Sequence, residues 1–135
     1  MSRYDETPRA ELGIAAAAAF LGAAGVGLAA VAAHRIPDPA LATAAQMLMI
    51  HAVAVLALAA WAVRSRTSAG MWRVAARLIL LGVTLFSGDI ALRSFYGERL
   101  FALAAPLGGS LVILGWVAGG VAALKDWLAA GRCRD

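Results

Sequence analysis

Four long stretches of apolar residues, separated by short polar segments, run through the chain. A bilayer core about 30 Å thick is crossed by roughly 20 helical residues, and each stretch comes close to that length or exceeds it. In the first two stretches the apolar residues surround the helix instead of forming one stripe, which is typical of helices that face lipid. Because hydrocarbon offers no partner to free backbone groups, we predict transmembrane helices. Their expected ranges are 12–33, 41–63, 72–92 and 100–124.

The polar segments predict how the chain is organised around these helices. We expect one all-α transmembrane domain over residues 12–124, a four-helix bundle, with an N-terminal tail of residues 1–11 and a C-terminal tail of residues 125–135. The first apolar stretch is longer than the apolar part of a typical signal peptide, and acids as well as arginines precede it. We therefore interpret it as a retained helix. Cleavage is the alternative, since "AVAAH" resembles a cleavage site.

The composition is that of a membrane protein. Apolar residues make up 62% of the chain and charged residues 15%, whereas soluble domains contain about 45–50% and about 25%. The net charge of +4 comes from short basic clusters without interleaved aromatic residues, so we expect the lipid bilayer as a partner and no nucleic acid. The single cysteine, Cys133, excludes an internal disulfide. No cofactor fingerprint and no paired histidine spacing for a metal is present.

The distribution of Lys and Arg predicts the orientation in the membrane. Nine of the twelve belong to the two tails and the middle polar segment with its flank, and three belong to the other two segments. Because cytoplasmic segments carry the excess of basic residues, we expect both termini in the cytoplasm. The nine are Arg3, Arg9, Arg64, Arg66, Arg73, Arg77, Lys125, Arg132 and Arg134; the three are Arg35, Arg93 and Arg99.

One carboxylate lies inside an apolar stretch, in "LFSGDIALRSF" (85–95). Only eleven residues separate Arg77 from Asp89, about 17 Å of helix, which is less than the roughly 30 Å core. The long side chain of Arg77 reaches the headgroups, whereas the short side chain of Asp89 does not, so Asp89 is the expected buried group. Arg93 follows at i+4 on the same helix face. The pair is interpreted either as an ion pair that closes the helix end or as a binding or proton-handling group.

Further polar residues are expected at similar depth, in the outer half of the membrane. With both termini inside, His51 lies about ten residues from the outer end of its helix, and Pro106 removes a backbone donor in the outer half of the fourth helix. We therefore predict a small polar pocket between the helices, open to the outer face. A histidine that only bonds a neighbouring helix is the alternative. The candidate residues are His34, His51, Ser87, Asp89, Arg93, Pro106, Gly108 and Gly109.

Small residues predict where helices approach each other closely. Gly22 and Gly25 lie among alanines in the first predicted helix, and Gly115 and Gly119 form a GxxxG pair in the fourth. Such faces allow close packing within one bundle or between two copies. Within a four-helix bundle we favour the intramolecular interpretation, and a homo-oligomer or a membrane-protein partner remains open.

Two segments resemble the signatures of a known family. "AAQMLMIHAVAVLALAA" (44–60) resembles a His-Ala-x-Ala-Leu signature, and "LFSGDIALRSFYGERLFALAAPLGGSLVILGW" (85–116) resembles a Phe-Ser-Gly…Pro-x-Gly-Gly…Gly-Trp signature. Both belong to the domain-of-unknown-function 423 family of small bacterial inner-membrane proteins, which also has eukaryotic transmembrane relatives. Members usually show Gly-Ala-Phe-Gly-Ala-His where this chain has "AAVAAH" (29–34), so His34 is kept and the glycines are alanines.

This resemblance implies a four-helix protein of the bacterial inner membrane and no catalytic activity. It implies that His34, His51, Ser87, Gly88, Pro106, Gly108 and Gly109 are family motif positions. Our first hypothesis is a non-enzymatic accessory or interaction protein with a polar pocket in the outer half. The alternative is binding or transport of a small molecule, a lipid or a proton through His51, Asp89 and Arg93. An intramembrane enzyme is a third hypothesis.

Overall fold

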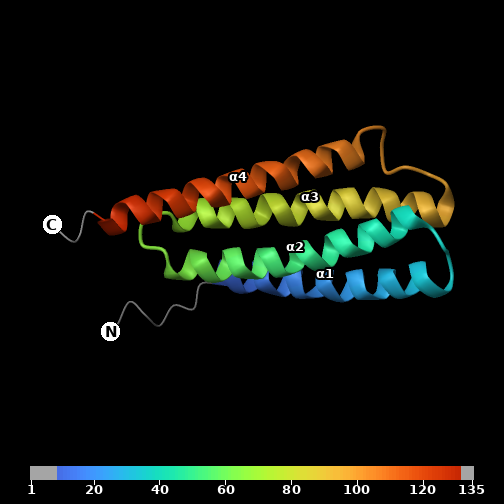
Figure 1. The fold of residues 1–135 in the computed structure, drawn as a ribbon, viewed down its shortest axis with the longest axis horizontal. Helices are drawn as coiled ribbons and strands as arrows, with labels where there is room; N and C mark the ends of the chain where they lie inside the picture. Colours follow the sequence, from blue (N-terminus) through green and yellow to red (C-terminus); the bar gives the residue numbers. More distant parts are fainter. Residues whose placement is uncertain (1–8, 132–135) are drawn as a thin grey trace.

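The structure, a computed structural model, describes residues 9–131. Over these residues the chain forms four long α-helices that run alternately up and down (Figure 1). Each helix is long and apolar enough to cross a membrane. The predicted all-helical fold with four such helices is therefore confirmed. The helices are α1 (Arg9–His34), α2 (Pro39–Arg64), α3 (Ala69–Tyr96) and α4 (Ala104–Gly131).

The boundaries of α4 differ from the predicted span of 100–124. The helix begins at Ala104, because the segment before it returns along the end of α3 and gives the backbone N–H of Leu100 to another partner. It continues to Gly131, beyond the predicted start of the C-terminal tail. The polar residues after 124 are too polar to be predicted as part of a membrane span, but they are compatible with a helix. The rest of both expected tails, residues 1–8 and 132–135 with Cys133, lies outside the described residues.

Local signals set two of the helix ends. Asp38 precedes α2 and accepts a hydrogen bond from the N–H of Ala40 (2.9 Å), which satisfies one free donor of the first turn. Pro39 follows at the first helical position, where no intrahelical N–H bond is needed. At the end of α3, Gly97 has φ 74° and donates its N–H to the carbonyl of Arg93. This left-handed conformation suits glycine and turns the chain back toward α4.

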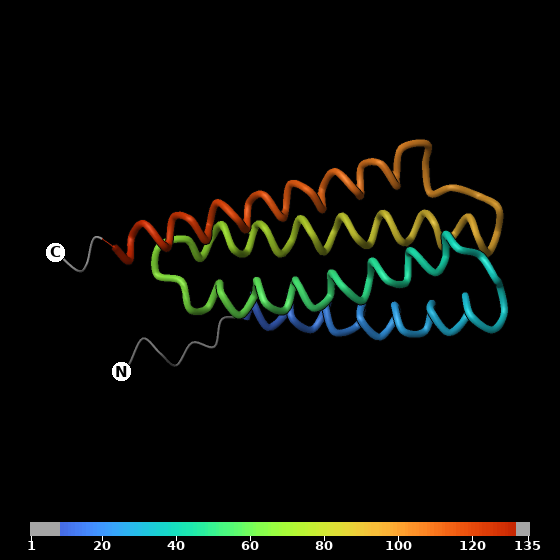
Figure 2. Tube along the Cα trace, in the orientation of Figure 1, coloured from blue at the N-terminus to red at the C-terminus, as the bar shows by residue number. Residues whose placement is uncertain are grey.

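The helices are arranged in an open row. Extensive contacts join α1 to α2, α2 to α3 and α3 to α4, whereas α1 touches α3 only slightly. Figure 1 shows α1 and α4 on opposite sides of the row, and Figure 2 shows the start of α1 and the end of α4 at the same end of the molecule. We call this end the Trp72 end, and the end where α3 finishes the Asp89 end.

Glycines bring the backbones of neighbouring helices close together. A Cβ atom built on Gly82 of α3 would lie 2.6 Å from the carbonyl oxygen of Gly108 of α4, and a Cβ on Gly115 would lie 2.5 Å from Ile79. On the other side of the row, Gly25 of α1 packs against Leu48 and the backbone of α2 in the same way. Gly22 and Gly119 also face α2. These contacts join helices of one chain and position the polar groups between them.

Candidate functional site at the Asp89 end

Asp89 is the most buried charged residue of the Asp89 end. Its side chain projects from the last third of α3 and is 1% exposed. One carboxylate oxygen accepts a hydrogen bond from Nη2 of Arg93 (2.6 Å), and the other accepts one from the backbone N–H of Leu100 (2.9 Å). Arg93 follows one turn later on the same helix and keeps 40% of its side chain exposed. Both oxygens of the carboxylate are therefore bonded by the chain itself, as a buried charge requires.

A second carboxylate lies at the turn between α1 and α2. Asp38 accepts a hydrogen bond from the hydroxyl of Ser94 on α3 in addition to the bond from Ala40. The bond from Ser94, which has the larger effect, and the bond from Ala40 hold the pKa of Asp38 below its ordinary value of 3.8. A shallow cleft of about 190 Å³ lies beside the pair and includes Arg93 and Ile90. The two acids thus tie both turns of this end to α3.

Ser87 and His51 make hydrogen bonds to helix backbones. The hydroxyl of Ser87 is buried and donates to the carbonyl of Ala44 on α2 (3.0 Å). Nδ1 of His51 lies 2.8 Å from the carbonyl of Met47, one turn earlier on the same helix. Because a carbonyl only accepts, Nδ1 donates this bond. The His51 ring meets Trp116 edge to face, with 6.2 Å between the ring centroids.

The structure brings together only part of the predicted pocket. Asp89 and Arg93 are paired, and Ser87 lies two positions before Asp89. His34 is exposed at the end of α1, and His51 lines neither of the two clefts nearest Asp89. Within residues 9–131, no hydrogen bond joins either histidine to Asp89, so a pocket that contains all of them stays a prediction.

Pro106 lies near the start of the fourth helix, because α4 begins at Ala104 and not at residue 100 as predicted. It lies in the first turn of α4, where proline is tolerated because its missing N–H has no intrahelical partner. The N–H of Leu107 bonds to the carbonyl of Leu103 (2.9 Å) and continues the helix. Gly108 is buried against α3, whereas Gly109 has no neighbouring atom within 4 Å of a built Cβ. Gly108 thus forms a close contact between α4 and α3 in this segment.

Comparison with known proteins decides the family. A family model with the description "Protein of unknown function (DUF423)" matches residues 28–109, more than half of the chain. The chain belongs to this family. The predicted resemblance is confirmed, and the match to this family runs from α1 to the first turns of α4, so it includes Asp38, Asp89 and Arg93.

A curated relative supports the same assignment. The UPF0382 membrane protein of Haemophilus influenzae is 34% identical to the chain over 73 residues, which are 51% of this chain and 53% of the relative. The chain thus spans about half the length of the curated relative that it matches. No solved structure matches. Together with four long apolar helices, these findings identify this member of the DUF423 family as a membrane protein.

Several groups at the Asp89 end were not anticipated from the sequence of this DUF423 family member. The N–H of Leu100 and the pair formed by Asp38 and Ser94 come from segments distant from Asp89 in the chain. Of these groups, only Asp38 is recognisable in the sequence, because an aspartate directly before a proline and an apolar run is typical of a helix start. Within residues 9–131, no three His, Cys, Asp or Glu side chains gather as metal ligands would.

Proposed function

We propose that the protein is a non-enzymatic accessory or interaction protein of the bacterial inner membrane, with both termini in the cytoplasm. The observation that carries the proposal is the bonding of Asp89, whose two carboxylate oxygens are taken by Arg93 and by the N–H of Leu100. A catalytic or transport carboxylate needs an oxygen that is open to substrate or proton. Asp89 instead holds the turn between α3 and α4 against α3.

The open row of helices supports an interaction role. Each outer helix has one extensively packed helix neighbour, α2 for α1 and α3 for α4. The remaining sides of α1 and α4 carry exposed apolar residues such as Phe20 and Ile113. In a membrane these sides contact either lipid or the helices of another protein. A partner helix therefore has room on both sides of the row.

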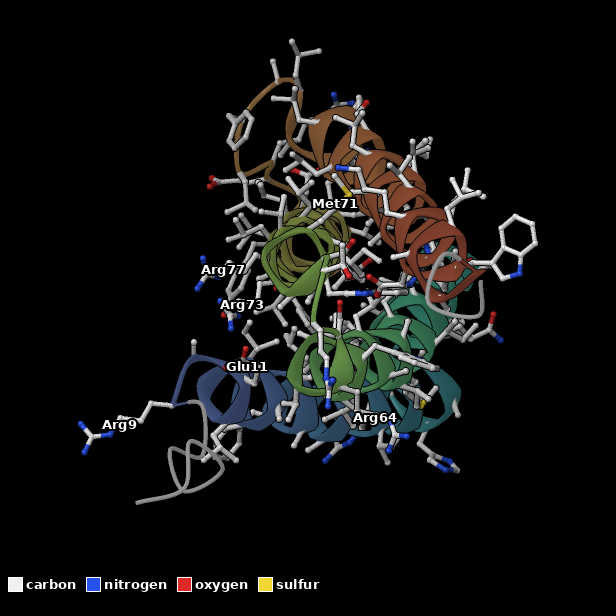
Figure 3. The ribbon with its side chains drawn as sticks, turned by 90° about the vertical axis from the view of Figure 1, so that its left-hand side faces the viewer. Arg9, Glu11, Arg64, Met71, Arg73 and Arg77 are labelled. Atoms are coloured by element: carbon white, nitrogen blue, oxygen red, sulfur yellow. The ribbon has the colours of Figure 1, made fainter. Side chains whose placement is uncertain are left out.

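The orientation is supported by the arrangement of the charges. The Trp72 end contains the ends of α2 and α4 and the starts of α1 and α3, which carry most of the basic residues of the described chain, among them Arg64, Arg73 and Arg77. Figure 3 views the molecule from this end. Because cytoplasmic segments carry the excess of Lys and Arg, this arrangement favours a cytoplasmic Trp72 end and an outer Asp89 end.

Cysteine labelling tests the orientation. Cys133 is the single natural cysteine, so a membrane-impermeant maleimide should fail to label it in intact spheroplasts and should label it after lysis. In a Cys133→Ser background, cysteine introduced by Glu98→Cys in the turn between α3 and α4 should show the reverse pattern. Labelling of Cys133 in intact spheroplasts would contradict cytoplasmic termini.

Reconstitution tests the accessory role against transport. Vesicles that contain the wild-type protein should show the same proton leak as empty vesicles, measured with an enclosed pH dye. The folded Asp89→Asn variant should lose thermal stability and capture of crosslinked membrane partners together, whereas Glu98→Gln, a change of an exposed acid in the same turn, should alter neither. A wild-type proton flux that a folded Asp89→Asn protein lacks would instead support transport.

A further inference from the structure

A cleft at the Trp72 end, far from the predicted outer pocket, has walls that come from three helices. It has a volume of about 410 Å³ and is lined by residues of α2, α3 and α4. It exists because α3 packs extensively on both α2 and α4, whereas no extensive contact joins α2 to α4. The volume lies in the range of sites that hold small molecules. The lining residues are Trp61, Trp72, Ala123, Asp126 and Trp127.

The walls of this tryptophan cleft are apolar. The rings of Trp61 and Trp72 are stacked, with 6.0 Å between their centroids, and Trp127 contributes an exposed ring from α4. The one acid in the lining, Asp126, accepts a hydrogen bond from Nε1 of Trp72 (2.9 Å) through one oxygen, and its other oxygen is buried. The carboxylate is thus directed into the protein. What the cleft offers an occupant is indole surface.

A positive charge lies over the ring of Trp61, one of the residues that line the tryptophan cleft. The guanidinium of Arg64 lies 6.0 Å from the centroid of the Trp61 ring. Within residues 9–131 the ion pairs are Arg73 with Glu11 and Arg93 with Asp89, so no described carboxylate pairs with Arg64. Figure 3 shows Arg73 and Glu11 beside each other and Arg64 apart from them, next to α2. Arg64 is therefore available to an anion from outside the chain.

We propose that the tryptophan cleft binds an anionic phospholipid, with an acyl chain between the indole rings and the phosphate on Arg64. An apolar cleft and an adjacent cation together match a molecule with an apolar chain and an anionic headgroup. A guanidinium binds phosphate oxygens through two parallel hydrogen bonds. Tryptophans are enriched at the depth of the headgroups, and basic sites between transmembrane helices bind anionic headgroups. Because the cleft opens between α2 and α4, a lipid enters it from the membrane plane.

Native mass spectrometry tests the headgroup. The full-length protein in maltoside detergent is offered equal amounts of phosphatidylglycerol and phosphatidylcholine with identical acyl chains, and we expect preferential retention of phosphatidylglycerol. Arg64→Gln should lower this preference about fivefold, the contribution of one basic residue near an anionic surface. Arg66→Gln, a change of an exposed arginine two positions later, is the matched control and should leave the preference unchanged. Equal retention of both lipids, or no effect of Arg64→Gln, would overturn the proposal.

A second variant tests the cleft. Ala123→Phe fills the space between the rings from an exposed position, so it should abolish retention of both lipids and leave the far-ultraviolet circular dichroism spectrum unchanged. Ala23→Phe places the same side chain on an exposed face of α1 and should have no effect. Undiminished phosphatidylglycerol retention by Ala123→Phe would show that Arg64 binds the headgroup without the cleft, and it would refute this site.

Discussion

Carboxylates stabilise both ends of the molecule, but at one end they bind the backbone of turns and at the other they bind side chains of a neighbouring helix. At the Asp89 end, Asp89 bonds to the backbone N–H of Leu100 and Asp38 to that of Ala40, so the acids fix turns. At the Trp72 end, Glu11 pairs with Arg73 and Asp126 accepts a bond from Trp72, so the acids fix one helix to another.

This difference follows from the packing of the row. Apart from its pair through Glu11, α1 touches α3 only slightly, so the bond to Arg73 links two helices that the apolar contacts leave apart. At the Asp89 end, α3 and α4 already meet through Gly82 and Gly108, and what remains to be fixed is the segment between them. Loss of the carboxylate bonds at the Asp89 end should therefore loosen the turns, whereas their loss at the Trp72 end should separate the helices.

Asp89→Ala should have the largest effect on stability. It leaves the N–H of Leu100 and the guanidinium of Arg93 without their partner, and hydrogen bonds to a charged group contribute about 1.5–3 kcal/mol each. We expect a loss of about 3 kcal/mol in the free energy of unfolding, measured by titration with dodecyl sulfate in mixed micelles. Glu98→Ala removes an exposed acid from the same turn and should change it by less than about 0.5 kcal/mol. Equal losses for the two variants would show that the bonds of Asp89 do not stabilise this turn.

Gly108→Ala should have the next largest effect. Its Cβ atom would lie 2.6 Å from the carbonyl oxygen of Gly82 and from the backbone N of Phe86, so α3 and α4 must move apart. Overpacking of this kind costs about 1–3 kcal/mol. Gly109→Ala is the adjacent control, because a Cβ atom there meets nothing within 4 Å. The same titration measures both variants, and a neutral Gly108→Ala would show that the close contact is not required.

Trp72→Phe tests the Trp72 end. It removes the Nε1 donor of Asp126 and part of a buried ring, and we expect a loss of about 1–2 kcal/mol. The change should also increase the distance between spin labels at the end of α4 and the end of α2, because Trp72 is packed against both helices. Trp127→Phe, at an exposed position near the end of α4, is the control. An unchanged distance with reduced stability would mean that this bond does not hold the helices together.

Asp38 should give the smallest effect, one that depends on pH. Its pKa in the folded protein is lowered, so its stabilisation is present above the ordinary value of 3.8 and is lost as pH falls through the folded pKa. The wild type should therefore be more stable than Asp38→Asn at neutral pH, and thermal unfolding should show this difference shrinking below pH 3.8. In a Ser94→Ala background the difference should disappear at a higher pH. A difference that grows with acidity would contradict the role of Asp38.

Much of the fold can be predicted from the sequence because it depends on local properties. Hydropathy over about 20 residues predicts four helices, and the spacing of Asp89 and Arg93 predicts a pair on one helix face. The start of α4 was misplaced because Leu100 to Leu103 are as apolar as a helix, and hydropathy does not reveal that their segment returns along α3. Gly97, with the conformation that a helix stop requires, carries the local signal for this turn.

The contacts between distant segments could not be predicted in the same way. Ser87 bonds to Ala44, 43 positions away, and Asp38 to Ser94, 56 positions away. Such bonds depend on the axial alignment of α2 and α3, which the apolar pattern does not determine. The predicted pocket assumed that residues at one depth share one cavity. The depth of a residue in the membrane does not determine the helix face on which it lies, as His51 and Gly109 show.

The bond between Asp89 and Leu100 has a consequence for how the chain enters the membrane. If α3 were released into lipid before its successor, Asp89 would be left with Arg93 alone, since the N–H of Leu100 arrives with the following segment. If α3 and α4 leave the translocation machinery together as a helical hairpin, the carboxylate of Asp89 enters the lipid already paired with Arg93 and bonded to the N–H of Leu100. We therefore expect the second half of the protein to be inserted as a pair of helices in a single step.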